Sequence, residues 1–93
     1  MLKIKRLDTK SKVPTKNHEA AAYDLYASRD CVISPNMTEK IHTDIAVELP
    51  EGYFAQIVPR SGITLKTNLL VQIGTIDNDY RGELGVIVYN KSQ

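Results

Sequence analysis

Hydrophobic and polar residues alternate with a period of two in three stretches of the chain. The clearest stretch covers residues 40–49, and the others cover residues 53–58 and 83–89. This period is typical of a β-strand with one buried face. Several short strands of this kind predict an all-β domain of the sandwich or barrel type.

Turn residues separate the predicted strands. Ser34-Pro35-Asn36 interrupts one extended stretch, and Leu49-Pro50-Glu51-Gly52 puts a proline and then a glycine between two predicted strands. Proline fixes φ at the first central position of a tight turn, and glycine accepts a positive φ at the second. We therefore expect a tight turn at residues 49–52.

One segment fits two structures. Residues 17–28 (NHEAAAYDLYAS) begin with a possible N-cap and contain three successive alanines, which favour a helix. In the same segment Tyr23, Leu25 and Ala27 alternate with Asp24 and Tyr26, as in a strand. Local propensity favours neither structure over the other.

The length of 93 residues predicts one small domain, covering residues 1–93. A chain this short buries only about 60–65% of the surface that its unfolded chain exposes, so we expect oligomerisation to supply further buried surface. The single cysteine, Cys31, excludes an internal disulfide. We expect it to be a packed, unreactive residue of a protein in a reducing compartment.

Charge and hydropathy exclude several classes of protein. Twelve Lys and Arg against eleven Asp and Glu give no reason to expect a nucleic-acid groove or membrane-surface binding. No apolar run approaches the roughly 20 residues that span a bilayer, and the start, MLKIKRLDTK, lacks the apolar centre of a secretory signal. We expect a cytoplasmic protein (nuclear or in the host cytosol if viral) that is not secreted.

Three clusters combine charged or hydroxyl-bearing residues with small ones. The first, residues 22–26 (AYDLY), embeds Asp24 among apolar neighbours, and the second, residues 59–64 (PRSGIT), follows a predicted strand directly. The backbone N–H groups of a Ser-Gly step and the guanidinium of Arg60 suit a phosphate. The same residues equally suit a surface turn in which Arg60 pairs with a carboxylate.

The third cluster, residues 74–83 (GTIDNDYRGE), sets two acids beside an aromatic ring. Asp77 could orient and deprotonate a water for attack on a phosphorus, and Tyr80 could offer a flat face to a sugar or base. The alternative is a turn whose acids only cap backbone donors. The acids favour a hard cation such as Mg²⁺, which one or two carboxylates usually hold together with substrate phosphates. His42 lies on the polar side of its strand, and we expect it to be exposed.

In order and spacing, the three clusters resemble the first three of the five motifs of the trimeric dUTP diphosphatase (dUTPase) family. AAAYDLYAS resembles the motif Ala-Gly-x-Asp-Leu, PRSGIT resembles Pro-Arg-Ser-Gly-Leu-Ala, and GTIDNDYRGELGVIVYN resembles the motif built around Gly-x-Ile-Asp-x-Asp-Tyr-Arg-Gly. The resemblance covers nearly the whole chain. It implies the all-β, β-clip type of fold of this family, with a strand at residues 17–28.

The resemblance also implies a reaction: Mg²⁺-dependent hydrolysis of dUTP to dUMP and pyrophosphate, which cleans the nucleotide pool and supplies dUMP. Asp77 would activate the attacking water. Tyr80 would stack on the deoxyribose and exclude a ribose 2′-hydroxyl. Asp24 would help to hold Mg²⁺ through water. The substrate-binding residues that the resemblance implies are Arg60, Ser61, Gly62, Val71, Gly74, Thr75, Ile76 and Tyr80.

Within that set, the resemblance implies that Ser61 and Gly62 contact the phosphate chain and that Arg60 holds their motif in place. It also implies that the backbone of residues 71–74 recognises uracil in a β-hairpin pocket. Residues 81–83 would be architectural. In the family each active site is assembled from three subunits, which implies a homotrimer with shared sites. Ala22 stands where the family usually has glycine, which matters if that position needs φ > 0.

The fourth family motif, of the type Gly-Asp-Arg-Ile-Ala-Gln, and the glycine-rich fifth motif do not occur in residues 1–93. We therefore expect a fragment of a complete enzyme, with an incomplete fold at its C-terminal side, in preference to a naturally short gene product.

Two other functions compete with dUTP hydrolysis. A dCTP deaminase shares the fold and nucleotide site, but it needs a catalytic glutamate and a different motif after the Arg-Ser turn, and this chain displays neither. A non-catalytic, regulatory binding module is motivated by the missing motifs, and it predicts that Asp77→Asn leaves the biological effect intact. A structural all-β domain without activity explains the alternation but not three ordered motifs.

Overall fold

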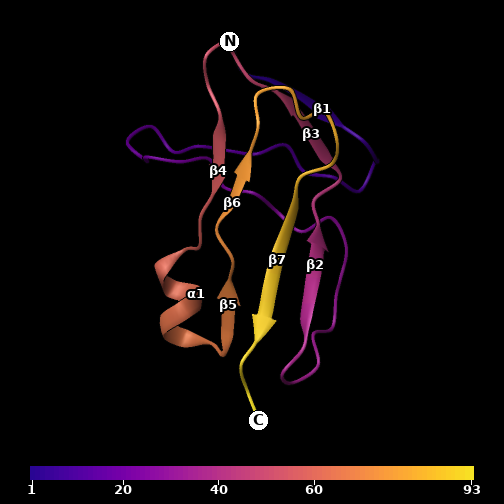
Figure 1. Cartoon of the computed structure of the whole chain (residues 1–93), viewed down its shortest axis with the longest axis vertical. Helices are drawn as coiled ribbons and strands as arrows, with labels where there is room; N and C mark the ends of the chain where they lie inside the picture. The colour runs from indigo at the N-terminus through magenta and orange to yellow at the C-terminus, as the bar shows by residue number, and fades with distance from the viewer.

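The computed structural model describes all residues from Met1 to Gln93, and its regular elements are short strands and one short helix joined by long loops (Figure 1). The elements in chain order are β1 (Lys3–Arg6), β2 (Thr38–His42), β3 (Ile45–Glu48), β4 (Ala55–Ile57), α1 (Ser61–Lys66), β5 (Leu69–Val71), β6 (Gly74–Ile76) and β7 (Gly85–Asn90). The predicted all-β class is confirmed. The predicted strands at 53–58 and 83–89 correspond to β4 and β7.

The strands form three small antiparallel sheets that do not close into a barrel. Their orders are β2-β7-β5, β1-β3 and β4-β6. β7 is the central strand of the largest sheet, since it pairs with β2 on one side and with β5 on the other. Helix α1 lies beside β5 (Figure 1). No helix in the structure combines the length and the apolar character that crossing a membrane requires.

The stretch predicted as one strand over residues 40–49 is two strands. β2 ends at His42 and β3 begins at Ile45, and between them Asp44 has a φ of +52°. Aspartate is one of the few residues that tolerate this left-handed conformation. Because of this bend, the first half of the stretch pairs with β7 and the second half with β1.

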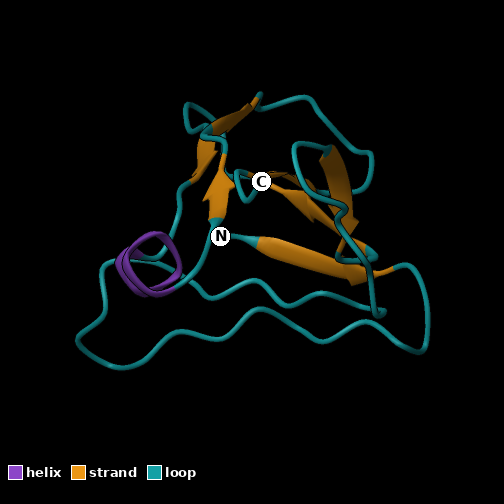
Figure 2. Ribbon diagram, turned by 90° about the horizontal axis from the view of Figure 1, so that it is seen from below, coloured by secondary structure: helices purple, strands orange, loops and turns teal.

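The segment at residues 17–28 is neither the helix that propensity allows nor the strand that the resemblance implies. Its only ladder contact is an isolated antiparallel bridge between Thr15 and Asp24. A short helix without a wide apolar stripe is marginal, and here Tyr26 instead hydrogen-bonds the Thr15 hydroxyl. Figure 2 shows two long loop segments running side by side along one side of the strands. Cys31, in the same region, is exposed. The expectation that it is a packed residue is therefore wrong.

The predicted tight turn at residues 49–52 is confirmed. The Tyr53 N–H donates to the Pro50 carbonyl at 3.1 Å, and Gly52 has a φ of +84°. The other predicted turn is also present, because the Met37 N–H donates to the Ser34 carbonyl at 3.1 Å.

The buried core is small for a chain of this length. Ile45, Val47 and Leu84 form its only cluster. The solvent-accessible surface is 6857 Å², whereas a monomeric protein of this mass exposes about 5,400 Å². An open apolar pocket of about 190 Å³ lies between Leu25, Ile63 on α1 and the β2-β7-β5 sheet. The single chain therefore leaves much apolar surface uncovered.

Candidate functional site

The third sequence cluster forms the loop between β6 and β7. Asp77 follows β6 directly, and its carbonyl accepts the Tyr80 N–H at 3.1 Å, which closes a turn. The side chains of Asp77 and Asp79 are exposed and make no hydrogen bond or ion pair. These acids therefore do not cap backbone donors, and the alternative of a capped turn is wrong. The Asp77 carboxylate is free to accept a proton from a water.

Asn78 fixes the start of this loop. Its Nδ2 donates to the Pro50 carbonyl at 2.8 Å and to the Tyr53 carbonyl at 2.7 Å. These two bonds tie the residue after Asp77 to the turn that precedes β4. No sequence pattern indicates this role, because both acceptors are backbone atoms more than 20 residues away.

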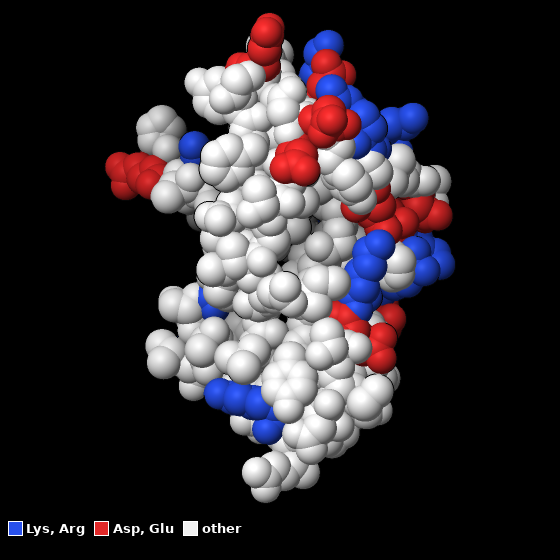
Figure 3. Space-filling model, viewed as in Figure 1, with Lys and Arg blue, Asp and Glu red and all other residues white.

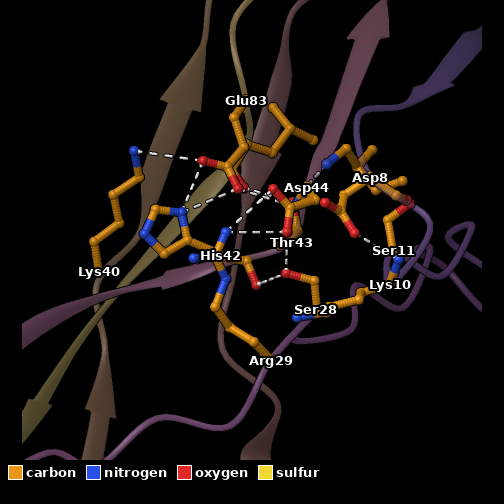
Figure 4. A network of polar contacts seen from close by, with 12 residues as sticks. Asp8, Lys10, Ser11, Ser28, Arg29, Lys40, His42, Thr43, Asp44 and Glu83 are labelled. Carbon is orange, nitrogen blue, oxygen red and sulfur yellow. Dashed lines mark hydrogen bonds and ion pairs between the residues drawn. The ribbon is translucent and has the colours of Figure 1, made fainter.

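Glu83 fixes the other end of the loop (Figure 4). Its Oε1 accepts the His42 Nδ1–H at 2.9 Å, and its Oε2 accepts the Asp44 N–H at 2.9 Å. Lys40 Nζ lies 3.8 Å from the same Oε1. The expectation that His42 is exposed is wrong, because the ring is half-buried against Glu83.

Asp44 continues this polar network. Its Oδ2 accepts the Ser28 Oγ–H at 2.5 Å and lies 3.2 Å from Arg29 Nη2. The hydrogen bond from Ser28 lowers the pKa of Asp44, burial opposes this effect, and Arg29 lowers the pKa further. Burial raises the pKa of Glu83, but the hydrogen bonds from His42 and the Asp44 N–H outweigh it, so this pKa also lies below its usual value. Both carboxylates are therefore held in the ionised form.

The first and second sequence clusters meet through one ion pair. Arg60 Nη1 lies 2.9 Å from Asp24 Oδ1. The structure therefore contains the arginine–carboxylate pair that the sequence offered as the alternative to phosphate binding. Ala22 does not have a positive φ, so its backbone conformation does not require the family's usual glycine.

The predicted turn at residues 59–64 is partly a helix. Ser61 and Gly62 are the first residues of α1, and Arg60 makes no side-chain capping bond. The first N–H groups of a helix have no intrahelical acceptor. Those of Ser61 and Gly62 are thus open to an anion.

Residues 71–76 do not form the hairpin that the resemblance implies. Val71 ends β5, which pairs with β7, whereas Gly74 begins β6, which pairs with β4. Between them the Gln72 N–H donates to the Ile87 carbonyl at 2.9 Å. The backbone here passes from one sheet to another.

The single chain does not bring all predicted site residues together. In the β4–β6 pair, Ala55 lies opposite Ile76 and Ile57 opposite Gly74. Arg60, which follows β4, therefore lies beyond one end of this pair, and Asp77, which follows β6, lies beyond the other end. At about 3.3 Å per residue the two lie roughly 15–20 Å apart. In Figure 1, α1 and the loop after β6 lie at opposite ends of the β4–β6 pair.

The donor set for a metal is one carboxylate. The structure contains no group of three or more His, Cys, Asp or Glu side chains that could hold an ion. Asp24 uses Oδ1 for Arg60 and keeps Oδ2 free of hydrogen bonds. Mg²⁺ usually keeps several waters and is held by one or two carboxylates with substrate phosphates. The residues therefore fit a Mg²⁺–triphosphate complex but not a free ion.

Around the site, charged and uncharged surface are segregated. On the face in Figure 3, Lys, Arg, Asp and Glu gather along one side, and the middle is largely uncharged. Phe54, Val58, Ile73 and Asp77 flank the ends of the paired strands β4 and β6. All three apolar side chains are exposed.

Comparison with known proteins places this geometry in a family. The family model described as dUTPase matches residues 9–93. Proteins named deoxyuridine 5′-triphosphate nucleotidohydrolase are 47% identical over 92 residues in Alkaliphilus metalliredigens, 41% over 88 in Fowlpox virus and 39% over 93 in Oryza sativa. These matches cover 96%, 94% and 99% of this chain, and 64%, 61% and 54% of those relatives. The chain thus spans about three-fifths of the length of these curated relatives.

Solved structures agree with this assignment. A mutant dUTPase from phage phi11 of S. aureus, described with a coordinated structural Mg(II) ion, superposes with a TM-score of 0.96 at 35% identity. The dUTPase of Staphylococcus bacteriophage 80alpha with dUpNHpp superposes with a TM-score of 0.94 at 36% identity. Both cover 100% of this chain, and this chain covers 61% and 56% of theirs.

Proposed function

Because the chain belongs to the dUTPase family, we propose that the protein hydrolyses dUTP to dUMP and pyrophosphate, with Asp77 as the general base. One observation carries the proposal. Asp77 presents an unpaired carboxylate on a loop that Asn78 and Glu83 fix at both ends. A general base must be both free and held in position, because its contribution depends on alignment with the attacking water.

The reaction needs one water and one proton acceptor. The oxygen of the water forms a bond to the α-phosphorus while its proton passes to the Asp77 carboxylate. The bond between the α-phosphorus and the bridging oxygen breaks, and that oxygen leaves with the pyrophosphate. Phosphoryl transfer needs little covalent help from protein, so positioning and charge neutralisation supply most of the catalysis.

Substrate selection follows from the neighbouring residues. Tyr80 stacks on the deoxyribose and leaves no space for a ribose 2′-hydroxyl. The backbone of residues 71–74 reads the edge of uracil and leaves no space for the methyl group of thymine.

The phosphate chain is bound by the other half of the site. The N–H groups of Ser61 and Gly62 donate to phosphate oxygens, and Arg60 holds that segment through Asp24. Asp24 would hold Mg²⁺ through water. When bound, Mg²⁺ neutralises the triphosphate charge. The structural Mg(II) ion described for the phi11 enzyme shows that a member of this family binds the metal.

Assembly completes the site. Arg60 and Asp77 of one chain are too far apart to serve one α-phosphate, so we propose a homotrimer in which neighbouring chains supply the two halves. The exposed apolar surface beside Asp77 supports association. A cytoplasmic location stays a prediction from the sequence.

The test is pyrophosphate release from dUTP in the presence of Mg²⁺, with UTP and dTTP as parallel substrates. We expect release from dUTP, and little from the other two. In Asp77→Asn we expect kcat to fall by roughly 10²–10⁴-fold, the usual contribution of a general base.

The matched control is Asp79→Asn, which makes the same carboxylate-to-amide change two residues away. Asp79 is exposed and unpaired, so we expect activity within about twofold of the wild type. Binding of dUTP without pyrophosphate release in the wild type would replace the proposal with a non-catalytic binding role.

A further inference from the structure

We infer that Gly82 and Glu83 fix the ring of Tyr80 and thereby set the discrimination between deoxyribose and ribose, an inference that rests on the function proposed above. Neither residue touches the substrate in this inference. Both are positioning residues that act through Tyr80.

The ring of Tyr80 packs closely against the Cα of Gly82. A Cβ added there would lie 2.6 Å from Tyr80 Oη, 2.7 Å from Cζ and 3.1 Å from Cε1. No side chain fits at these distances unless the ring moves. The φ of Gly82 is not positive, so the reason for glycine here is space and not backbone conformation.

Glu83 fixes the hydroxyl end of the ring. The Tyr80 Oη–H donates to the Glu83 carbonyl at 2.7 Å. That carbonyl cannot drift, because the Glu83 carboxylate is bonded to His42 and to the Asp44 N–H at 2.9 Å each. The next N–H, of Leu84, donates to the Ile45 carbonyl at 2.8 Å.

Burial does not hold the ring. Tyr80 is 42% exposed, so its surroundings leave it space to change rotamer. The contact with Gly82 and the bond to Glu83 are therefore the restraints on its position. The ring can exclude a hydroxyl only while it is held in place, because a ring that moves aside makes space for the hydroxyl.

The first experiment compares Gly82→Ala with the wild type in the full protein. We expect the ratio of kcat/KM for dUTP to that for UTP to fall by about tenfold, since the displaced ring opens space beside the 2′ carbon. The fold should persist, because the exposed ring can swing into solvent.

Asp79→Ala is the control. It removes an exposed, unpaired side chain from the same loop and adds no atom beside the Tyr80 ring. We expect its dUTP-to-UTP ratio to stay within about twofold of the wild type. If Gly82→Ala keeps the wild-type ratio while Tyr80→Ala lowers it, the ring matters but Gly82 does not position it, and the inference is wrong.

Three further variants separate the two restraints. Tyr80→Phe keeps the ring and loses the bond to Glu83, and we expect a smaller fall in the ratio, about threefold to fivefold. Glu83→Ala removes the carboxylate that holds the Glu83 carbonyl in place, so the dUTP-to-UTP ratio should fall in this variant too. In Glu83→Gln the one amide oxygen, at the place of Oε2, can accept from both His42 Nδ1 and the Asp44 N–H, which lie 3.1 and 2.9 Å from Oε2. This variant should therefore restore most of the ratio. Equal ratios in Glu83→Ala and the wild type would overturn the role of Glu83.

A second readout does not depend on catalysis. Nuclear Overhauser contacts between the Tyr80 ring protons and the two Gly82 Hα protons should be strong in the wild type. In the Gly82→Ala variant, the contact from the remaining Hα proton at this position should be weak. If the wild type shows these contacts but hydrolyses nothing, the proposed function fails while the positioning stands. If the contacts are missing in the wild type, the positioning itself fails.

Discussion

His42 shows how one side chain can differ from its place in a pattern. It lies on the polar side of an alternating stretch, yet its ring donates to Glu83, a residue 41 positions later in the chain. The alternation describes only which side of the strand a residue occupies. It says nothing of what lies on that side, and here β7 and the loop before it bring a carboxylate there.

At the same scale, the two carboxylates beside His42 predict acid sensitivity. The folded-state pKa values of Asp44 and Glu83 lie below their usual values of 3.8 and 4.5. A lowered pKa contributes stability above the unfolded-state value, and that contribution is lost as the pH falls through the folded-state value. We expect the free energy of unfolding, measured by urea titration, to be level near pH 6 and to fall below about pH 4.5.

Glu83→Gln tests this prediction, because it removes the titrating group and keeps most hydrogen bonds. The fall between about pH 5 and pH 3 should become shallower in this variant, with Asp44, Arg29 and Lys40 left in place. Glu39→Gln is the control, since Glu39 is exposed on β2 and should leave the profile unchanged. Parallel profiles for Glu83→Gln and the wild type would contradict the prediction.

Among the elements, the bend between β2 and β3 divides one alternating stretch between two sheets. Thr43 is 1% exposed; its hydroxyl donates to the Leu84 carbonyl at 2.6 Å and accepts the Ile45 N–H at 3.3 Å. Thr43→Val keeps the shape but leaves two buried backbone groups unpaired. We expect it to lower the free energy of unfolding by about 1–3 kcal/mol in chemical denaturation.

Thr43→Ser is the control for this change, because it keeps the hydroxyl and loses one methyl group. It should cost about 1 kcal/mol, and less than Thr43→Val. If the serine variant proves the less stable of the two, packing and not hydrogen bonding holds the bend.

The elements also show which parts of the fold could be predicted from the sequence. The turn at residues 49–52 was predictable because proline and glycine fix it locally, and β7 because its alternation is regular. The bend at Asp44 could not be predicted, because the alternation of hydrophobic and polar residues continues through it without a break. The bend is held by the hydrogen bonds that Asp44 makes with Ser28 and Glu83, which are distant in the chain. In the site, the three clusters were recognisable as motifs. The anchors Asn78 and Glu83 were not, since their partners are distant in the chain.

For the whole molecule, the separation of Arg60 from Asp77 predicts complementation between inactive chains. Chains with Asp77→Asn lack one half of the site, and chains with Arg60→Gln lack the other. If the two are unfolded together and reassembled at random, about a quarter of the shared sites combine two intact halves. We expect pyrophosphate release to return to roughly that fraction of the wild-type rate.

The control mixture pairs Asp77→Asn chains with chains that carry both substitutions, in which no intact site can form. Mixed assembly is verified by native mass spectrometry. Activity that stays at the level of the separate variants in verified mixed assemblies would mean that one chain supplies both halves.

The position of β7 also has a consequence for synthesis on the ribosome. The strand at the centre of the β2-β7-β5 sheet is the last of the three to be made. Until it emerges, β2 and β5 have no partner, and their free backbone edges are open to pairing with other nascent chains. Contacts of such long sequence separation also form slowly. The vulnerable period of this protein therefore falls between the synthesis of β2 and that of β7, while the largest sheet still lacks its middle strand.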